Sequence, residues 1–529
     1  MNNRIIQTVF PLVFVLLAMS ACHKDLNLRP KYGFNSAAVY DTADNYIHVV
    51  AKLYAGFVLS GNEGPAGNPD IADIDEGFSP YLRVYWNLQE LPTDAAKCRW
   101  NDVGIPELNT MRWSSSNSFV KAMYSRLFFQ ITLANEFIRE CSEENMERRG
   151  FAEVDREKIR GFRAEAQWIR AFVWSHAIDL FGGNVPFVTE ADGIGANLPP
   201  QTNGKELFAY VEQELLSIED ELPAAGTAEY PRVDQGALWF LLAKMYLNAE
   251  AWTGEDRYSD CATYVDKIIN SNAYSLDPNY KRLFTLNNVN STEAIFSVAC
   301  DGAFTQSFGG TTFLVHAFVG GNMNTNDFGI TGGWEGYRAT KAYTDLFVAD
   351  SAVSDRFTWH HEGHIQSIDT FDQFDNGWAQ AKYKNVFYEN NGDTLTPDNY
   401  SLNSQVDLDF HWMRLAEVYL MYAECAARGA GSTGQGLNYI NMLRTRANEP
   451  VVASYDLDFV LDERGRELSW EGSRRTDLVR FDKFTSSSYV WEWKGDDPNG
   501  VGVSDHLNIY PLNADDVIAN PNLQQNTGY

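Results

Sequence analysis

The sequence predicts a mostly α-helical protein in which antiparallel helix pairs stack, with loop-rich aromatic segments between an early and a late group of helices. Three observations support this fold class. Apolar residues recur every three or four positions in several long stretches, as on one face of a helix. Between residues 272 and 408 this periodicity is lost, and Gly and Asn clusters separate short apolar runs. Hydrophobic residues make up 44% of the 529 residues, which is ample for a globular core.

The first 21 residues are predicted to be a lipoprotein signal peptide. Arg4 supplies the positive start, residues 9–19 form the apolar core, and small residues precede Cys22. The apolar run is too short to span a bilayer. Met-Ser-Ala-Cys resembles a bacterial lipobox, so we expect cleavage before Cys22 and lipidation of that cysteine; an ordinary secretory signal is the alternative. Residues 22–35 are polar and are predicted to be a lipidated tether.

The rest of the chain, residues 36–529, is predicted to form a single domain. The helical scaffold is expected at about 36–59, 114–271 and 409–481, the loop-rich segments at about 60–113 and 272–408, and a C-terminal segment at 482–529. The clearest helix is 155–181, whose apolar residues step by three and four until Gly182-Gly183 ends it. Antiparallel pairs that cannot bury both faces alone tend to stack as a solenoid, although no strict 34-residue repeat is present.

The individual elements follow from the same periodicity and from capping residues. Further helices are expected at 114–142, 203–222, 234–251, 256–270, 337–348 and 435–447, and a buried helix at 409–428 that is apolar nearly all round. The stretches 294–300 and 311–319 are expected to be strands or extended loops, and 62–92 a loop. Residues 349–407 are irregular and longer than an ordinary loop, which favours a functional insertion.

Residues 462–481 are predicted to form a helix with a charged stripe. Arg464, Glu467, Glu471 and Arg475 fall three or four apart, so their charges lie on one face. Two glycines in the same stretch suggest that another backbone packs closely against it. We interpret the stretch as a structural staple held by ion pairs rather than as a ligand site.

Composition excludes several classes of function. The net charge is −29, and removal of the signal peptide takes away only Arg4 among the charged residues. This balance argues against binding to nucleic acid or to anionic membranes.

After Cys22 five cysteines remain, an odd number without zinc-site spacing, and Cys141, Cys261 and Cys425 are expected to be buried.

No motif gives a persuasive catalytic or metal site. The run His360-His361-Glu362-Gly363-His364 lacks the spacing of a zinc protease helix, and the acidic residues of 70–76 lack the spacing of a calcium loop. Carboxylates number 71, so a pair suitable for a glycosidase could be drawn anywhere and indicates nothing. Neither a metal nor a cofactor is predicted.

Aromatic residues in loops are the remaining functional signal. Trp100 lies in CRWND beside Asn101 and Asp102. Phe308 lies in QSFGG and Trp334 in TGGWEG, where glycine neighbours leave a ring face open. Neutral sugars have apolar C–H faces and polar rims, so a site for them needs flat rings and planar hydrogen-bonding groups. Each of these rings, taken alone, is more often a loop anchor or a core residue than a ligand contact.

Three motifs resemble the SusD/RagB family of nutrient-binding outer-membrane lipoproteins. They are RGRELSWEGSRRTDLVRF at 464–481, WMRLAEVYLMYAECAAR at 412–428 and the closing YPLNADDVIANPNLQQNTGY at 510–529, where Thr527 replaces the usual proline. The resemblance implies a right-handed superhelical scaffold of tetratricopeptide-like helix pairs that carries a loop-rich ligand-binding face. It also implies a non-catalytic role: capture of an oligosaccharide at the cell surface and its delivery to a SusC-like TonB-dependent outer-membrane barrel.

Within that family, residues 75–94 and 231–254 are similar to the starch-binding branch. The aromatic arc of that branch corresponds to Trp100, Phe308 and Trp334, with Arg83 and Asn101 as polar partners; Phe308 stands where a tyrosine is expected. The resemblance therefore implies starch or another α-glucan as the ligand. The alternatives are the same role for a different glycan or a peptide, and, in a different class, a glycan-degrading enzyme.

Overall fold

The computed structural model describes residues 39–529 except 194, 196–197, 290, 390–393 and 396–404. The predicted signal peptide, the lipidation site Cys22 and the tether 22–35 lie outside the described residues. The helices are α3 Tyr46–Ala55, α4 Tyr81–Glu90, α5 Ile105–Asn109, α6 Ser118–Glu140, α7 Glu143–Arg148, α8 Glu153–Phe181, α9 Gly204–Ser217, α10 Gln235–Thr253, α11 Tyr258–Ser271, α12 Gly310–His316, α13 Lys341–Val348, α14 Leu415–Ala427, α15 Thr433–Arg446, α16 Leu457–Glu467, α17 Arg474–Arg480 and α18 Ala514–Ala519. The predicted fold class, mostly helical with few short strands, is confirmed.

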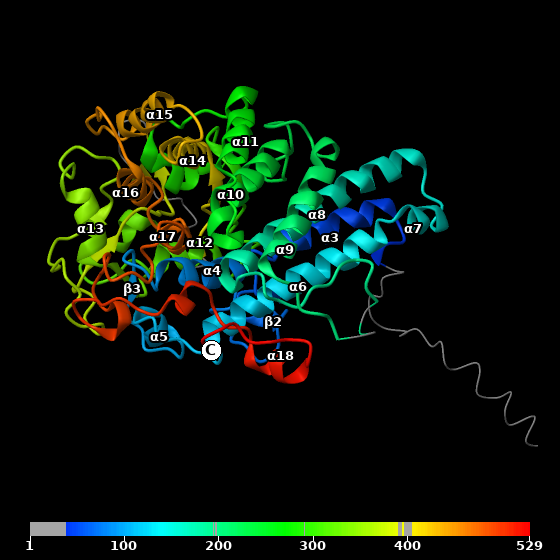
Figure 1. The fold of residues 1–529 in the computed structure, drawn as a ribbon, viewed down its shortest axis with the longest axis horizontal. Helices are drawn as coiled ribbons and strands as arrows, with labels where there is room; N and C mark the ends of the chain where they lie inside the picture. The colour runs from blue at the N-terminus through cyan, green and yellow to red at the C-terminus, as the bar shows by residue number, and fades with distance from the viewer. Residues whose placement is uncertain (1–38, 194, 196–197, 290, 390–393, 396–404) are drawn as a thin grey trace, which may run out of the picture.

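Neighbouring helices pack side by side in a continuous stack (Figure 1). Helix α6 contacts α8, α8 contacts α9, α10 contacts α11, and α11 contacts α14, which pairs with α15. Side chains of Asn117, Asn203 and Asp234 accept hydrogen bonds from backbone N–H groups at the starts of α6, α9 and α10. Gly182 ends α8 in the left-handed conformation, as the glycine pair predicts. The early helices therefore form as their patterns indicate.

The strands are short and come from segments scattered along the chain. They are β1 Gly61–Glu63, β2 Gly67–Pro69, β3 Lys97–Cys98, β4 Ala294–Val298, β5 Tyr337–Ala339, β6 Trp359–His360, β7 Trp378–Gln380, β8 Phe387–Tyr388, β9 Thr394–Leu395 and β10 Phe410–Arg414. The largest sheet has the antiparallel order β3-β5-β7-β6. It joins segments that are far apart in sequence and carries the loops described below.

Several expected elements differ from those observed. The first helix is α3, shorter than the expected 36–59. Residues 81–90, expected to be loop, form α4, and 310–316, expected to be extended, form α12. Almost every residue of both helices is buried, so neither shows the polar face that identifies a helix in sequence. The expected helix 409–428 begins as strand β10, which pairs with β4, and becomes helical only from Leu415.

The stretch 462–481 is two helices rather than one. Helix α16 ends at Glu467 and α17 begins at Arg474, with Trp470 and Gly472 in left-handed conformations between them. The indole of Trp470 is fully buried, and its Nε1 donates a hydrogen bond to the carbonyl of Ala95 at 2.9 Å. A buried aromatic anchor therefore interrupts the helix and turns α17 back toward α4.

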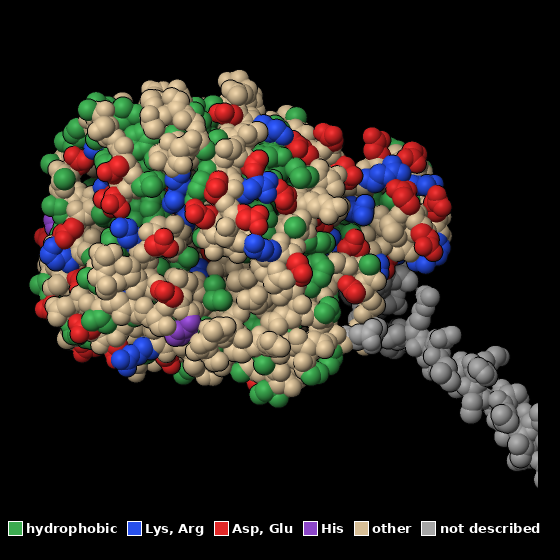
Figure 2. Space-filling view, viewed as in Figure 1, with side chains coloured by type: hydrophobic (Ala, Val, Ile, Leu, Met, Phe, Trp, Pro, Cys, Tyr) green, Lys and Arg blue, Asp and Glu red, His purple; other side chains and the backbone are tan. Residues whose placement is uncertain are grey.

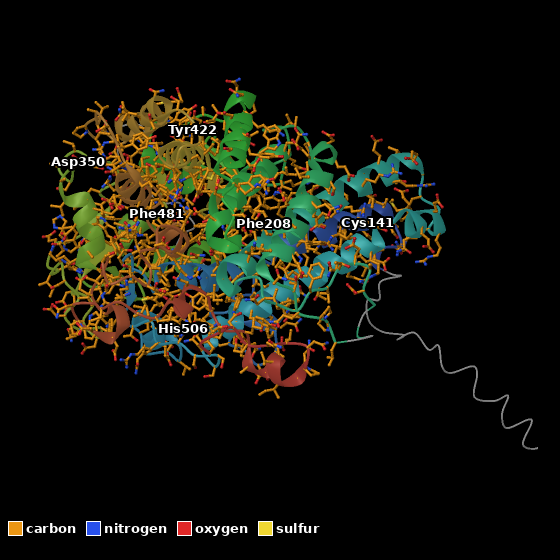
Figure 3. The ribbon with its side chains drawn as sticks, viewed as in Figure 1. Cys141, Phe208, Asp350, Tyr422, Phe481 and His506 are labelled. Atoms are coloured by element: carbon orange, nitrogen blue, oxygen red, sulfur yellow. The ribbon has the colours of Figure 1, made fainter. Side chains whose placement is uncertain are left out.

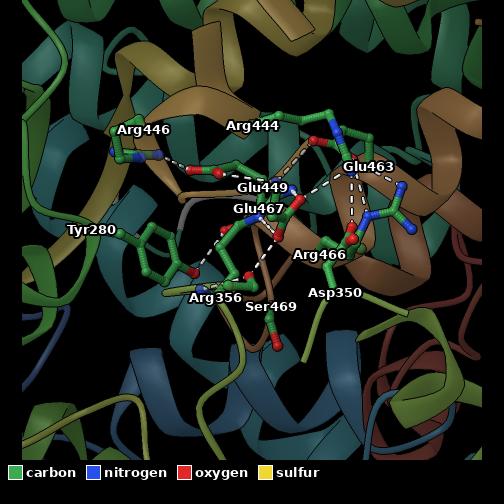
Figure 4. A network of polar contacts seen from close by, with 12 residues as sticks. Tyr280, Asp350, Arg356, Arg444, Arg446, Glu449, Glu463, Arg466, Glu467 and Ser469 are labelled. Atoms are coloured by element: carbon green, nitrogen blue, oxygen red, sulfur yellow. Dashed lines mark hydrogen bonds and ion pairs between the residues drawn. The ribbon is translucent and has the colours of Figure 1, made fainter. Parts of the chain in front are cut away.

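Buried ion pairs hold this junction, as the staple interpretation predicts (Figure 4). Glu467 is fully buried and receives hydrogen bonds from Arg414 at 2.6 Å, Arg356 at 3.3 Å and Arg446. Burial by itself raises the pKa of Glu467, but these three guanidinium groups lower it well below its usual range. The charged stripe thus faces the interior and not solvent.

The cysteines lie where the sequence analysis expects them. Cys141, Cys261 and Cys425 are buried as expected, and none of the five described cysteines forms a disulfide. Figure 3 places Cys141 near the α7 end of the molecule and Tyr422 of α14 near α15. Figure 2 shows acidic and basic side chains together over α7 and the start of α8. No helix in the described part of the chain is long and apolar enough to cross a membrane.

Candidate ligand-binding site

A cavity of about 450 Å³ contains most of the residues singled out by the sequence; we call it the Trp100 cavity. It is lined by Asp75, Gly77, Phe78, Arg83, Trp100, Asp102, Val103, Ile105, Ser118, Phe119, Phe308 and Trp334. Helices α4 and α5, the start of α6 and the loops before α4, after β3, before α12 and before β5 supply these residues. The elements α4, α5, α12 and β3 gather in the lower left half of the view in Figure 1.

The three predicted aromatic residues lie together. The ring centroids of Trp100 and Trp334 are 6.3 Å apart with an interplanar angle of 46°, and those of Phe308 and Trp334 are 6.3 Å apart at 66°. Trp334 is therefore the central ring, and each neighbour is turned against it. All three side chains are half-buried. The rings form a bent surface rather than one flat platform.

The backbone fixes Trp100 and Trp334 relative to each other. Trp100 Nε1 donates a hydrogen bond to the carbonyl of Trp334 at 3.0 Å. A Cβ atom at Gly336 would lie 2.6 Å from the Trp100 ring, so only glycine allows this approach. The imidazole of His316 stacks on Trp334 at 5.1 Å and 24°. His316 thus packs against one face of the Trp334 ring, and Trp334 also lines the cavity.

Arg83 supports the rings from α4. Its guanidinium lies 5.6 Å from the centroid of Trp100 and 5.8 Å from that of Trp334, within cation–π range. One of its terminal nitrogens donates to the carbonyls of Gly77 at 2.8 Å and Phe308 at 2.9 Å. Burial lowers the pKa of Arg83 from its usual value. The contacts tie two loops of the cavity wall to one helix.

The polar residues differ in part from those expected. Asn101 is exposed and does not line the cavity, whereas its neighbour Asp102 does. Asp75 and Ser118 line it as well, and sequence reasoning did not single them out as ligand contacts. Asp75 belongs to an acidic cluster that was weighed only as a calcium loop. Adjacent polar residues in a loop give no period from which the inward-facing one can be chosen.

The histidine-rich segment does not form a metal centre. His360 ends the short strand β6, and Gly363 has φ +76°, so the segment turns instead of forming a helix. Within the described residues, no group of three or more His, Cys, Asp or Glu side chains is placed to hold a metal ion.

Comparisons with known proteins agree with one another. Residues 369–529 match the SusD family. The starch-binding protein SusD of Bacteroides thetaiotaomicron is 31% identical, with all of both chains covered. SusD-like protein P2 of Formosa agariphila is 24% identical over 80% of this chain and 83% of that protein.

Solved structures share the fold at lower identity. A SusD superfamily protein from Bacteroides vulgatus has a TM-score of 0.69 and 19% identity, covering 92% of this chain and 99% of that one. Surface glycan-binding protein A from Bacteroides fluxus has a TM-score of 0.68 and 18% identity, covering 92% and 100%. These likenesses bear out the expected scaffold of tetratricopeptide-like helix pairs.

Proposed function

The chain belongs to the SusD family, and from that premise we propose that it is a cell-surface lipoprotein that captures an α-glucan, such as starch or a maltooligosaccharide. It delivers the bound chain to a SusC-like TonB-dependent barrel in the outer membrane, to which Cys22 anchors it through lipid. The protein acts by binding alone. The observation that carries the proposal is the convergence of Trp100, Phe308 and Trp334 on one cavity.

The shape and chemistry of the Trp100 cavity support a glycan ligand. Its volume lies in the range of pockets that hold small molecules. The successive angles of 46° and 66° between its rings suit a chain that curves, as an α-glucan does, because each sugar can stack on a ring turned against the last. Asp75, Asp102 and Ser118 provide acceptors and a donor for hydroxyl groups at the rim.

Calorimetry with maltoheptaose tests the proposal. Trp100→Ala and Trp334→Ala should each weaken binding by on the order of 2 kcal/mol, as aromatic hot spots do, and together should abolish measurable binding. Trp239→Ala is the matched control, because Trp239 is a half-buried tryptophan of α10 that donates to Glu219 and does not line the cavity. Wild-type affinity in the double variant would contradict the assignment of the site.

The alternatives give different outcomes in the same assays. In one outcome the wild-type protein does not bind maltoheptaose and instead binds another glycan or a peptide. If the double variant then loses that binding, the protein has the same capture role for a different ligand. A glycan-degrading enzyme would release reducing ends from starch, and Asp75 with Asp102 would be its candidate carboxylates. We expect no release by the purified protein. Release of reducing ends by the wild-type protein that is lost in Asp102→Asn would show that the protein is an enzyme and not only a binding protein.

A further inference from the structure

A second cavity, of about 400 Å³, lies beside the first and involves the histidine-rich segment. We call it the Phe374 pocket. Its wall includes Arg99, Asn322, Glu335, His364, Phe374 and Asp375. Four separate parts of the chain meet here: the residue after β3, the segment after α12, the residues before β5 and the connection from β6 to β7.

The same two backbone segments, 99–100 and 334–335, line both the Phe374 pocket and the Trp100 cavity. Trp100 and Trp334 line the first cavity, and their chain neighbours Arg99 and Glu335 line the second. Arg99 N–H donates to the carbonyl of Gly336 at 2.7 Å, which holds the two segments together. Glu335 has φ +52°, a left-handed conformation that is unfavourable for a residue with a side chain. In this conformation the carboxylate of Glu335 contacts both Arg99 and the Gly321 N–H.

Polar groups of the Phe374 pocket are held in fixed directions. Glu335 accepts a hydrogen bond from the Gly321 N–H at 3.1 Å and pairs with Arg99 at 2.6 Å. The Asn322 amide donates to the carbonyl of Glu362 at 2.9 Å and accepts from His360 Nε2 at 2.7 Å. Side chains that are fixed before binding lose little conformational entropy when a ligand arrives.

His364 offers a defined acceptor. Its Nδ1 is 2.8 Å from the carbonyl of Gly377, which can only accept, so Nδ1 carries the proton and Nε2 is an acceptor in the neutral ring. A Cβ atom at Gly321 would lie 3.9 Å from this Nε2 and 3.3 Å from the ring of Phe374. The space above Gly321 is therefore bounded by one polar nitrogen and one aromatic ring.

The balance of charge and shape selects the class of ligand. Arg99 is neutralised by Glu335, and the further carboxylates Asp372 and Asp375 on the wall disfavour phosphate and other anions. The absence of a metal-holding group among the described residues leaves no cation centre here. Phe374 is only 7% exposed and offers little stacking surface, so the donors and acceptors around it set the ligand class; they suit a neutral sugar, whose hydroxyls both donate and accept.

We propose that the Phe374 pocket is a second saccharide-binding site, distinct from the Trp100 cavity, that takes one or two sugar units of a neutral oligosaccharide. The site goes beyond the proposed function, because it adds a contact lined by the chain neighbours of the aromatic residues. A long polysaccharide could occupy both sites at once, and a second weak contact on the same chain raises the overall affinity without any change in the first.

Hydrogen–deuterium exchange on the full mature chain tests the proposal with maltoheptaose, cellohexaose and laminarihexaose as probes. Peptides covering 360–376 report the Phe374 pocket, and peptides covering 75–83 and 305–310 report the Trp100 cavity. We expect at least one probe to protect 360–376 with its own concentration dependence. Asn322→Ala and Asp375→Ala should each raise the concentration for half-maximal protection there about fivefold to tenfold, as the loss of a hydrogen bond does.

The controls separate this site from the first. The same two variants should leave protection at 305–310 unchanged, and Thr331→Ala, an exposed residue that lines neither cavity, should alter nothing. The proposal is overturned if no probe protects 360–376. It is also overturned if protection there follows the 305–310 curve in every variant, because the pocket would then only report the Trp100 cavity. Protection confined to 360–376 would instead refute the proposed function and leave this site standing.

Discussion

Phe308 is the smallest of the three rings in the Trp100 cavity and meets Trp334 nearly edge-on, at 66°. Because a phenyl ring offers less stacking area than an indole and has no polar group, we expect Phe308→Ala to weaken glycan binding by less than either tryptophan substitution. Phe308→Tyr should bind at least as tightly, since it adds a hydroxyl without removing the ring. Calorimetry with maltoheptaose measures both effects.

The neighbouring Phe304 provides a matched control for Phe308. It is 86% exposed and does not line the cavity, so Phe304→Ala should leave affinity unchanged. None of these substitutions should lower the thermal midpoint of unfolding by more than a few degrees. An equal loss in Phe304→Ala and Phe308→Ala would contradict a specific role for Phe308.

At the residue scale the sequence indicated which residues are aromatic and lie in loops, but not which side chains enter the cavity. Phe308 and Trp334 are recognisable as rings beside glycine, and Trp100 as a ring beside two polar residues. Asn101 and Asp102 are both polar and adjacent, and only the backbone path after β3 decides which one enters the cavity. The Glu335 side chain was not predictable at all, because its direction depends on a left-handed φ at a non-glycine residue.

At the scale of elements, the junction between α16 and α17 depends on buried charge. Glu467 is fully buried among Arg356, Arg414 and Arg446. Glu467→Ala would leave these guanidinium groups without a compensating carboxylate, so we expect a loss of about 3–5 kcal/mol in the free energy of unfolding. Urea denaturation measures it, and Glu147→Ala at an exposed pair is the control. Unchanged stability with abolished sugar binding would show instead that this region is a ligand site.

The same junction predicts a dependence of stability on acid. Burial raises the pKa of Asp477, but Arg464 and Arg480, each at 2.8 Å, outweigh it and lower the pKa to about 2. The folded state therefore binds fewer protons than the unfolded state between about pH 4 and about pH 2. Stability from this group is complete above that window and is lost as the pH falls through it, by about 2 kcal/mol.

Asp477→Asn tests this dependence. The variant should be less stable near neutral pH, because two buried arginines lose their anion, and its stability should fall less steeply in acid. Asp458, whose side chain is 79% exposed, is the control for a surface carboxylate, and Asp458→Asn should keep the wild-type slope. A wild-type slope in Asp477→Asn would refute the role of this ion pair in acid sensitivity.

Helices were predictable where they are long or carry a capping residue, and two short helices that are buried on all sides were missed. Helices α6, α8 and α10 carry a clear apolar stripe or a capping residue, and the sequence placed them within a few residues. Helices α4 and α12 are buried on all sides and are short, so their residues show no helical period. The break at Trp470 was not predictable, because its indole is buried against remote parts of the chain such as Ala95.

At the scale of the whole molecule, both cavities depend on segments separated by more than two hundred residues. Trp100 contacts Trp334 across one cavity, and Arg99 pairs with Glu335 at the other. The helical stack brings these loops together, so neither site can be retained in a fragment that lacks either half of the chain. The fold class was predictable from local patterns, but this convergence required the resemblance to a family or the structure itself.

Attachment of the whole molecule to the membrane is predicted to depend on Cys22 alone. Met-Ser-Ala-Cys resembles a lipobox, and the net charge of −29 gives the body no electrostatic attraction to anionic lipid. One acyl chain binds a membrane weakly and reversibly, whereas two or more hold stably, so removal of every acyl chain should be decisive. Cys22→Ala should therefore move the protein from the outer-membrane fraction to the soluble fraction in cells that lack the barrel partner.

The variant must also keep its binding function if the cysteine serves only as an anchor. Purified Cys22→Ala protein should bind maltoheptaose with wild-type affinity and unfold at the wild-type temperature, because residue 22 precedes the described body by 17 positions. Cys141→Ala is a poor comparison, since that side chain is buried; Ser20→Ala, two residues before the proposed cleavage point, leaves the lipidated cysteine in place and should remain in the membrane. Retention of Cys22→Ala in the membrane fraction without the barrel would refute the lipoprotein assignment.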